Sequence, residues 1–161
     1  MKQKISLATL FSYIFLFLFY LSNLTQAQIA VGQWRDHLPY SDGRKVAIAG
    51  NKVYCATSAG LFFYDKDDNS VHKLSKINGL SDIGVSTINY DTQNNILIIG
   101  YSNGNIDMIK NNEIINISDI YRKQMIGRKT INDVLFIDNA AYLSCAFGIV
   151  VLNTDKVEIS D

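Results

Sequence analysis

The sequence has few of the residues that build disulfide scaffolds, metal centres or nucleic-acid-binding surfaces. Its 161 residues include one proline, one tryptophan, two histidines and two cysteines. Fifteen lysines and arginines balance fifteen aspartates and glutamates, so the formal net charge is zero. A chain without a basic excess lacks the electrostatic footprint of a nucleic-acid-binding protein, and we therefore expect no nucleic acid partner.

Motifs for catalysis and metal binding are missing as well. The chain has no nucleophile elbow, no zinc motif and no phosphate-binding loop. His37 and His72 stand apart from other ligand residues, so surface positions are expected for both. The acidic run Asp65–Asn69 resembles the start of an EF-hand loop, but Ser70 and Lys76 stand where that loop needs glycine and glutamate. We expect no enzyme activity, no cofactor and no metal site, and a solvated turn at the acidic run.

The longest apolar run lies at the N-terminus. Lys2 and Lys4 precede the nearly all-apolar stretch Ile5–Leu21, and Thr25-Gln-Ala27 ends with small residues suited to cleavage. These are the parts of a secretory signal peptide. A membrane anchor is the alternative, because about 17 apolar residues reach the lower limit for crossing a bilayer. The polar residues after the run favour cleavage, so the sequence predicts an exported protein with a signal peptide over 1–27 and no transmembrane segment after cleavage.

Three stretches of the chain repeat one pattern at a step of 44 residues. Each repeat has a glycine at a turn, an asparagine upstream of it and an apolar residue downstream. The turn glycines are Gly60, Gly104 and Gly148. A period of about 40–45 residues rich in short strands is typical of a four-stranded propeller blade. The sequence therefore predicts an all-β fold, a β-propeller fragment of about three four-stranded blades.

The repeat sets the expected division of the chain. A lead-in segment over 28–43 precedes a partial propeller over 44–161, with blades at about 44–75, 84–117 and 131–160. A single antiparallel sandwich or barrel is the alternative, but a sandwich has no reason to repeat at blade length. Short runs rich in β-branched residues exclude a helical solenoid. Because propellers close with about four to eight blades, we interpret the chain as the N-terminal piece of a longer protein.

Three further expectations follow from this arrangement. The three turn glycines should occupy equivalent hairpin positions with positive φ, which glycine adopts without steric penalty. Cys55 and Cys145 lie two blades apart, too far for the Cα separation of a disulfide, so we predict two buried free thiols. The connection 118–130 carries a basic cluster that is either solvated or in contact with an anionic glycan or a partner. Its members are Arg122, Lys123, Arg128 and Lys129.

Part of the second repeat resembles the propeller repeat of periplasmic two-component regulators. The resemblance rests on Asn78-Gly-Leu-Ser-Asp82, Val85-Ser-Thr-Ile88 and Asn95-Ile-Leu-Ile-Ile-Gly100. Ile98 and Tyr101 stand where those repeats usually have tryptophan and threonine. This resemblance implies the sensor propeller of a hybrid two-component regulator in the periplasm.

A second resemblance covers essentially the whole mature chain. Gln33-Trp-Arg-Asp-His-Leu-Pro-Tyr40, Asn51-Lys-Val-Tyr54 and Gly60-Leu-Phe-Phe-Tyr-Asp65 are similar to the N-terminal propeller of the PorZ family, a type IX secretion system component of Bacteroidota. Ile131-Asn-Asp133 and Phe147-Gly-Ile-Val150 fit the same pattern. The resemblance assigns no ligand-binding residue.

The PorZ resemblance implies a non-enzymatic exported protein at the cell surface or outer membrane. Proteins of that family belong to an attachment complex with a sortase-like protease and other type IX secretion components, and the complex transfers cargo onto anionic lipopolysaccharide. The expected role is thus a scaffold that recognises protein partners and lipopolysaccharide. A propeller enzyme is a further alternative, because the fold hosts all three functions.

Overall fold

The computed structural model describes residues 38–160 together with Phe11 and Tyr13. The chain divides into a unit over Met1–Trp34 and a unit over Arg35–Asp161, and the second unit contains all the strands described. The predicted cleavage site, Trp34 and His37 lie outside the described residues, as does most of the predicted signal peptide.

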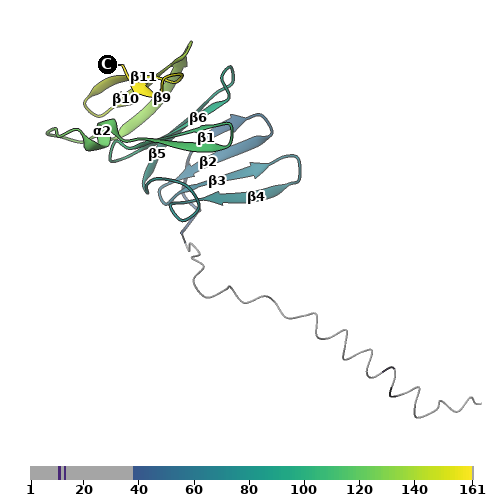
Figure 1. Cartoon of the computed structure of the whole chain (residues 1–161). Helices are drawn as coiled ribbons and strands as arrows, with labels where there is room; N and C mark the ends of the chain where they lie inside the picture. Colours follow the sequence, from purple (N-terminus) through teal and green to yellow (C-terminus); the bar gives the residue numbers. More distant parts are fainter. Residues whose placement is uncertain (1–10, 12, 14–37, 161) are drawn as a thin grey trace, which may run out of the picture. The chain divides into compact units, whose positions relative to one another are not determined.

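Residues 38–160 form three antiparallel sheets of four strands, and neighbouring strands in each sheet are consecutive in the chain (Figure 1). Blade 1 consists of β1 (Gly43–Ala49), β2 (Lys52–Thr57), β3 (Leu61–Asp65) and β4 (Ser70–Leu74). Blade 2 consists of β5 (Val85–Asp91), β6 (Ile96–Tyr101), β7 (Ile106–Lys110) and β8 (Glu113–Ile117). Blade 3 consists of β9 (Ile131–Ile137), β10 (Ala140–Cys145), β11 (Gly148–Asn153) and β12 (Glu158–Ile159). This architecture confirms the predicted all-β propeller fragment of about three blades.

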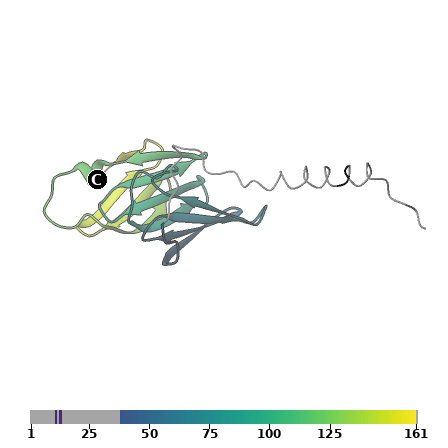
Figure 2. The same ribbon diagram turned by 90° about the horizontal axis from the view of Figure 1, so that it is seen from below.

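The apolar core lies in the two seams between neighbouring blades. Figures 1 and 2 both show the sheet of blade 2 between the other two sheets. One buried cluster joins blade 1 to blade 2 and includes Ala56, Leu61, Leu97 and Ile99. The other joins blade 2 to blade 3 and includes Ile98. Blades therefore stabilise one another face to face, as the layers of a repeat protein do.

The sequence of the second strand in each blade reflects this layering. In β6 every residue is buried, because both faces of blade 2 are covered, and the strand reads as one continuous apolar run. In β10 buried and exposed residues alternate, because only one face of blade 3 is covered. The uncovered faces of blades 1 and 3 expose several large apolar side chains, among them Val46, Ile48, Val71, Leu135, Ile137 and Ile149.

The blades begin with small irregularities in their ladders. The register shifts between Gly43 and Lys45 in β1 and between Val85 and Thr87 in β5. The hydroxyl of Ser86, the extra residue in β5, donates to the carbonyl of Ile131 at 2.7 Å and so links blade 2 to blade 3. A β-bulge of this kind re-aims a side chain that would otherwise follow the pleat.

Two local details differ from the sequence-based expectation. The blade expected at about 131–160 ends in a fourth strand that spans only Glu158–Ile159, because Val157 has a φ of +58° and continues the preceding turn. A short helix, α2 (Asp119–Arg122), occupies the connection between blades 2 and 3, where only a loop is expected.

Candidate functional site

The described residues hold no cluster of side chains suited to bind a metal ion. Within 38–160 no three histidine, cysteine, aspartate or glutamate side chains gather as metal ligands would. In the acidic turn, the carboxylate of Asp65 accepts a hydrogen bond from the backbone N–H of Asp67, and that of Asp68 accepts one from the N–H of Ser70. These carboxylates therefore stabilise the turn in which they lie. No helix in the described part of the chain is long and apolar enough to cross a membrane.

A buried carboxylate in blade 2 has a structural role. Asp107 is 0% exposed and accepts hydrogen bonds from the hydroxyl of Tyr101 at 2.6 Å, the N–H of Ser81 at 2.8 Å and the amide of Asn116 at 2.9 Å. Burial, and then the hydrogen bond to Asp107, raise the pKa of Tyr101, so its phenol remains a donor. Because every partner is internal, this network fixes the connection 75–84 to blade 2 rather than offering a reactive group.

The turn glycines are not equivalent in the structure. Gly104 has a φ of +88° and Gly148 a φ of +147°, whereas Gly60 does not have a positive φ. The prediction of positive φ is thus wrong at Gly60. At Gly60 the glycine carbonyl accepts the N–H of Thr57 across a two-residue turn, whereas the N–H of Tyr101 pairs with Asn105 across a longer turn that contains Gly104.

Gly60 and Gly104 both permit close approaches of other segments. A Cβ on Gly60 would lie 3.0 Å from the carbonyl oxygen of Leu74. A Cβ on Gly104 would lie 2.8 Å from Cγ2 of Ile120 and 2.8 Å from Cβ of Lys129. Both contacts of Gly104 belong to the connection 118–130, so this glycine lets the connection rest directly on the turn of blade 2.

The base of the connection 118–130 is well anchored. Ile120 is 5% exposed and belongs to the core cluster between blades 2 and 3. The hydroxyl of Thr130 donates to the carbonyl of Ser102 at 3.0 Å, and the ammonium of Lys129 donates to the carbonyl of Tyr121 at 2.6 Å. The beginning and the end of the connection are therefore both held against the same end of blade 2.

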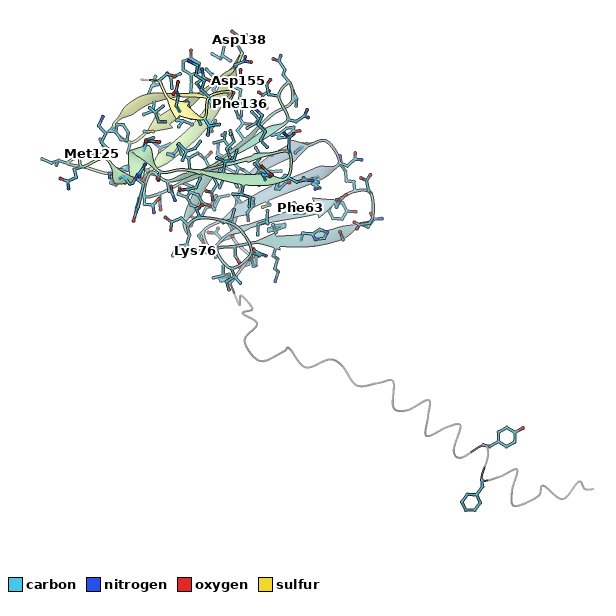
Figure 3. The ribbon with its side chains drawn as sticks, in the orientation of Figure 1. Phe63, Lys76, Met125, Phe136, Asp138 and Asp155 are labelled. Atoms are coloured by element: carbon cyan, nitrogen blue, oxygen red, sulfur yellow. The ribbon has the colours of Figure 1, made fainter. Side chains whose placement is uncertain are left out.

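The outer part of the connection carries most of the predicted basic cluster. Arg122 lies 3.9 Å from the carboxylate of Asp119, with both side chains more than half exposed. Lys123 and Arg128 are exposed and make no ion pair or side-chain hydrogen bond with any residue that the structure describes. Figure 3 shows Met125 at the outer end of this connection. All four basic residues thus lie in the connection 118–130, as their sequence spacing suggests, but Lys129 lies at its base against Gly104.

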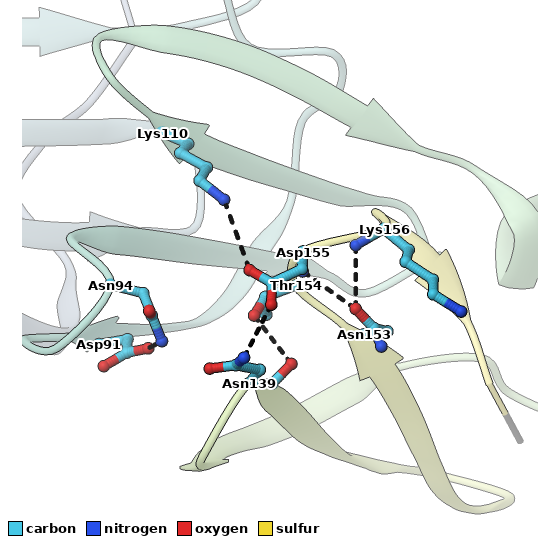
Figure 4. Close-up of polar contacts among 8 residues, drawn as sticks. All are labelled: Asp91, Asn94, Lys110, Asn139, Asn153, Thr154, Asp155 and Lys156. Carbon is cyan, nitrogen blue, oxygen red and sulfur yellow. Dashed lines mark hydrogen bonds and ion pairs between the residues drawn. The ribbon is translucent and has the colours of Figure 1, made fainter.

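Polar side chains stabilise the opposite, hairpin end of the blades (Figure 4). In blade 3 the amide of Asn139 donates to Asp155 at 2.8 Å, and Lys110 of blade 2 reaches the same carboxylate at 3.9 Å. In blade 1 Asn51 donates to Asp67 at 2.6 Å in the same way. In blades 1 and 3 the asparagine that marks the repeat therefore ties the first hairpin of the blade to the second, whereas Asn95 of blade 2 accepts a hydrogen bond from Tyr90 instead.

A cleft of 460 Å³ lies between blades 1 and 2 at this hairpin end. Tyrosines and asparagines line most of it, with one basic residue, Lys52. The phenol of Tyr90 donates to Asn95 at 2.9 Å, while burial, and then the neighbouring Tyr90, raise the pKa of Tyr54. Neutral aromatic and amide groups of this kind can bind a polar ligand but supply no acid, base or nucleophile at neutral pH.

Side chains from the innermost strands meet between the blades. Lys45 of blade 1 donates to Asp133 of blade 3 at 3.1 Å, and the amide of Asn89 in blade 2 donates to the carbonyl of Val134 at 2.7 Å. Lys45, Asn89 and Asp133 follow the same step of 44 residues. The sequence analysis predicted neither these contacts between innermost strands nor the tyrosine cleft. The signal for the first was the repeat step of 44 residues, which relates Lys45, Asn89 and Asp133.

Both cysteines are free thiols. Cys145 is buried, as predicted, and burial raises its pKa to about 11. Cys55 is only half-buried, because it faces the uncovered side of blade 1, so the expectation of two buried thiols is wrong at this residue.

Comparisons with known structures place these features in a family. The chain is similar to PorZ of Porphyromonas gingivalis, described as an essential bacterial surface component of the type IX secretion system. It has 30% sequence identity and a TM-score of 0.75, over 81% of this chain and 18% of that protein. This chain therefore spans less than a fifth of the length of that PorZ.

More distant structures share the fold alone. The extracellular domain of a putative hybrid two-component system from B. thetaiotaomicron has 15% identity and a TM-score of 0.63, over 79% of this chain and 17% of that protein. AztD of Citrobacter koseri has 16% identity and a TM-score of 0.54, over 74% of this chain and 32% of that protein. No curated protein sequence matches the chain.

The family assignment follows from sequence and structure together. The family model for the type IX secretion PorZ N-terminal β-propeller domain matches residues 53–161, which include blades 2 and 3 and most of blade 1. The same residues form the three stacked sheets, and the PorZ structure superposes on them. The chain belongs to the PorZ N-terminal β-propeller family.

Proposed function

We propose that this chain forms the first blades of an exported, non-enzymatic component of the type IX secretion system at the cell surface. The observation that carries the proposal is the family match over 53–161 together with 30% identity to a PorZ that is described as a surface component of that system. The chemistry of blades 1 to 3 agrees with it, because the buried ionisable groups serve the fold. The propeller acts as a scaffold that presents loops to partners.

The proposed partners are a sortase-like protease, other type IX secretion components and anionic lipopolysaccharide. A propeller suits this role because its connections gather at one end of the blades, where several loops can contact one partner. In blades 1 to 3 that end carries the turns at Gly104 and Gly148 and the basic connection 118–130. Its positive charge favours an anionic ligand.

Affinity purification of the full-length protein from solubilised outer membranes tests this proposal. Mass spectrometry should detect the sortase-like protease and further type IX components with the tagged protein and not with a tagged unrelated outer-membrane protein. Recovery without any type IX component from envelopes that contain the system would refute the scaffold role.

A sensor role in a hybrid two-component regulator is the second candidate. The similar fold of the extracellular domain from B. thetaiotaomicron favours it, although 15% identity supports a shared fold alone. A sensor needs a membrane-spanning run of about 20 apolar residues before its kinase domain. A reading of the parent gene beyond Asp161 separates the two candidates. A spanning helix followed by a histidine kinase module would support the sensor, and a small β-rich sorting domain would support the secretion component.

A further inference from the structure

The tyrosine cleft, the hollow of 460 Å³ between blades 1 and 2, departs from the pattern of the repeat. Its lining includes Lys52, Tyr54 and Tyr90. In the next seam the corresponding positions, 44 residues further along the chain, hold Ile96, Ile98 and Val134. These three residues are at most 3% exposed and belong to the core cluster between blades 2 and 3. Apolar residues at these positions are enough to stack two blades, so the polar set in the first seam is not required for packing.

The clearest sign of a ligand in the cleft is the hydroxyl of Tyr54. Tyr54 is 7% exposed, and its ring packs against that of Phe63 with 5.1 Å between the centroids. The hydroxyl makes no hydrogen bond with any residue that the structure describes. Because a tyrosine hydroxyl usually finds a partner when the residue is buried, this one is left to bond with water or with a ligand in the cleft.

The wall that blade 2 contributes carries further polar groups. The hydroxyl of Tyr90 donates to Oδ1 of Asn95 at 2.9 Å, and the amide nitrogen of Asn95 has no partner among the described residues. Asn111 and Asn112, with φ of +53° and +64°, bring two more amides from the turn after β7. The cleft therefore presents phenol and amide groups from two blades, and these groups both donate and accept hydrogen bonds.

Lys52 gives the cleft a positive charge. Its ammonium lies 5.0 Å from the centroid of the Phe63 ring and forms no ion pair with any residue in the described part of the chain. None of the described residues that line the cleft is an aspartate or a glutamate. A ligand with one carboxylate therefore complements the charge of this site.

The combination of groups fits a peptide better than a saccharide. Leu97 and Ile109 give the cleft an apolar wall beside its phenols and amides. A peptide has apolar side chains for that wall and backbone amides for the polar groups. Tyrosine together with asparagine is also the combination with which antibody paratopes bind proteins. A saccharide carries hydroxyl groups on most of its carbons and has no aliphatic group to cover Leu97 and Ile109.

We propose that the tyrosine cleft binds an extended peptide segment of a protein partner. The segment accepts a hydrogen bond from Tyr54, packs an apolar side chain against Leu97 and Ile109, and places a carboxylate at Lys52. This inference rests on the proposed scaffold function, because it names a surface through which the propeller binds a partner. The cleft lies at the hairpin end of the blades, away from the basic connection 118–130, so the two surfaces can be tested separately.

Peptide selection on the full-length protein tests the proposal. Phage that display random short peptides are selected on the immobilised protein, and the enriched peptides are synthesised with a fluorescent label. Fluorescence anisotropy then gives their affinities. We expect the enriched peptides to share an aspartate or glutamate close to an apolar residue. A glycan microarray probed with the same protein covers the other class of ligand.

Matched variants localise the binding. Tyr54→Phe should weaken binding of the enriched peptides by about threefold to tenfold, because one hydrogen bond is lost. It should leave the urea midpoint unchanged, since the hydroxyl has no internal partner, and a purely structural role would not give this result. Lys52→Gln should weaken binding by about twofold to fivefold at low salt and little at high salt. Tyr64→Phe and Lys66→Gln make the same changes outside the cleft and should have no effect on binding.

Three outcomes would overturn the inference. The first is a selection that enriches no peptide. The second is a set of enriched peptides that bind the Tyr54 or the Lys52 variant as tightly as the unaltered protein at low salt. The third is a saccharide on the array whose binding depends on Tyr54, which would assign the cleft to a glycan. Each of these leaves the role in secretion to its own test, because co-purification with type IX components does not depend on which surface binds them.

Discussion

Replacing Gly104 by alanine should detach the connection 118–130 from blade 2. The φ of +88° at Gly104 strains any L-residue, at a cost of about 1–3 kcal/mol. The new Cβ would also lie 2.8 Å from Cγ2 of Ile120, 2.8 Å from Cβ of Lys129 and 3.2 Å from the Lys129 carbonyl oxygen. Since a backbone atom is among them, the connection has to shift and lose packing, and we expect a total loss of about 2–4 kcal/mol.

Gly127→Ala is the matched control for this prediction. Gly127 has a φ of +112°, so it shares the backbone strain, but a Cβ there would meet nothing within 4 Å. Its substitution should cost the backbone strain alone, about 1–3 kcal/mol, and therefore less than Gly104→Ala. Urea unfolding of the full-length protein followed by circular dichroism measures both. Equal losses for the two variants would refute the close approach at Gly104, and an unchanged midpoint for Gly104→Ala would refute the turn geometry as well.

Four further outcomes are expected. N-terminal sequencing of the exported protein should begin at Gln28, and a mature protein that retains its first methionine would disprove cleavage. Residues 28–161 expressed alone should associate in size-exclusion chromatography through the uncovered blade faces, whereas a sharply melting monomer would contradict this. Tyr101→Phe should cost about 1–3 kcal/mol in urea unfolding because a buried carboxylate loses a donor, while Tyr64→Phe at an exposed hydroxyl should cost little. Because burial raises the pKa of Cys145, the free energy of unfolding should fall as the pH rises from 9.0 to about 11, and Cys145→Ala should remove that loss.

The blade architecture can be predicted from the sequence because each blade consists of four strands that recur every 44 residues. The continuous apolar run of β6 and the alternating pattern of β10 even distinguish a blade covered on both faces from one covered on a single face. The sequence step misleads at Gly60, however. Gly60 lacks the positive φ of Gly104 and Gly148, and what it shares with Gly104 is the close approach of another segment, which the spacing alone does not reveal.

The candidate contact surfaces were less predictable, since they arise between blades. The basic residues of 118–130 are close in sequence, so their cluster was visible in advance, but the full exposure of Ile126 depends on how Ile120 and Lys129 fix the base. The tyrosine cleft brings together Tyr54 and Tyr90 from different blades. Their meeting follows from the stacking of the sheets, which a linear pattern does not encode.

Deletion of the gene, with complementation by the full-length copy, tests the proposed secretion role most directly. Cargo proteins of the type IX system are then quantified at the cell surface and in the periplasm by surface labelling and fractionation. Our account predicts that the deletion strain loses surface-attached cargo and that the full-length gene restores it. Cargo that remains attached at wild-type levels in the deletion strain would contradict a role in type IX secretion.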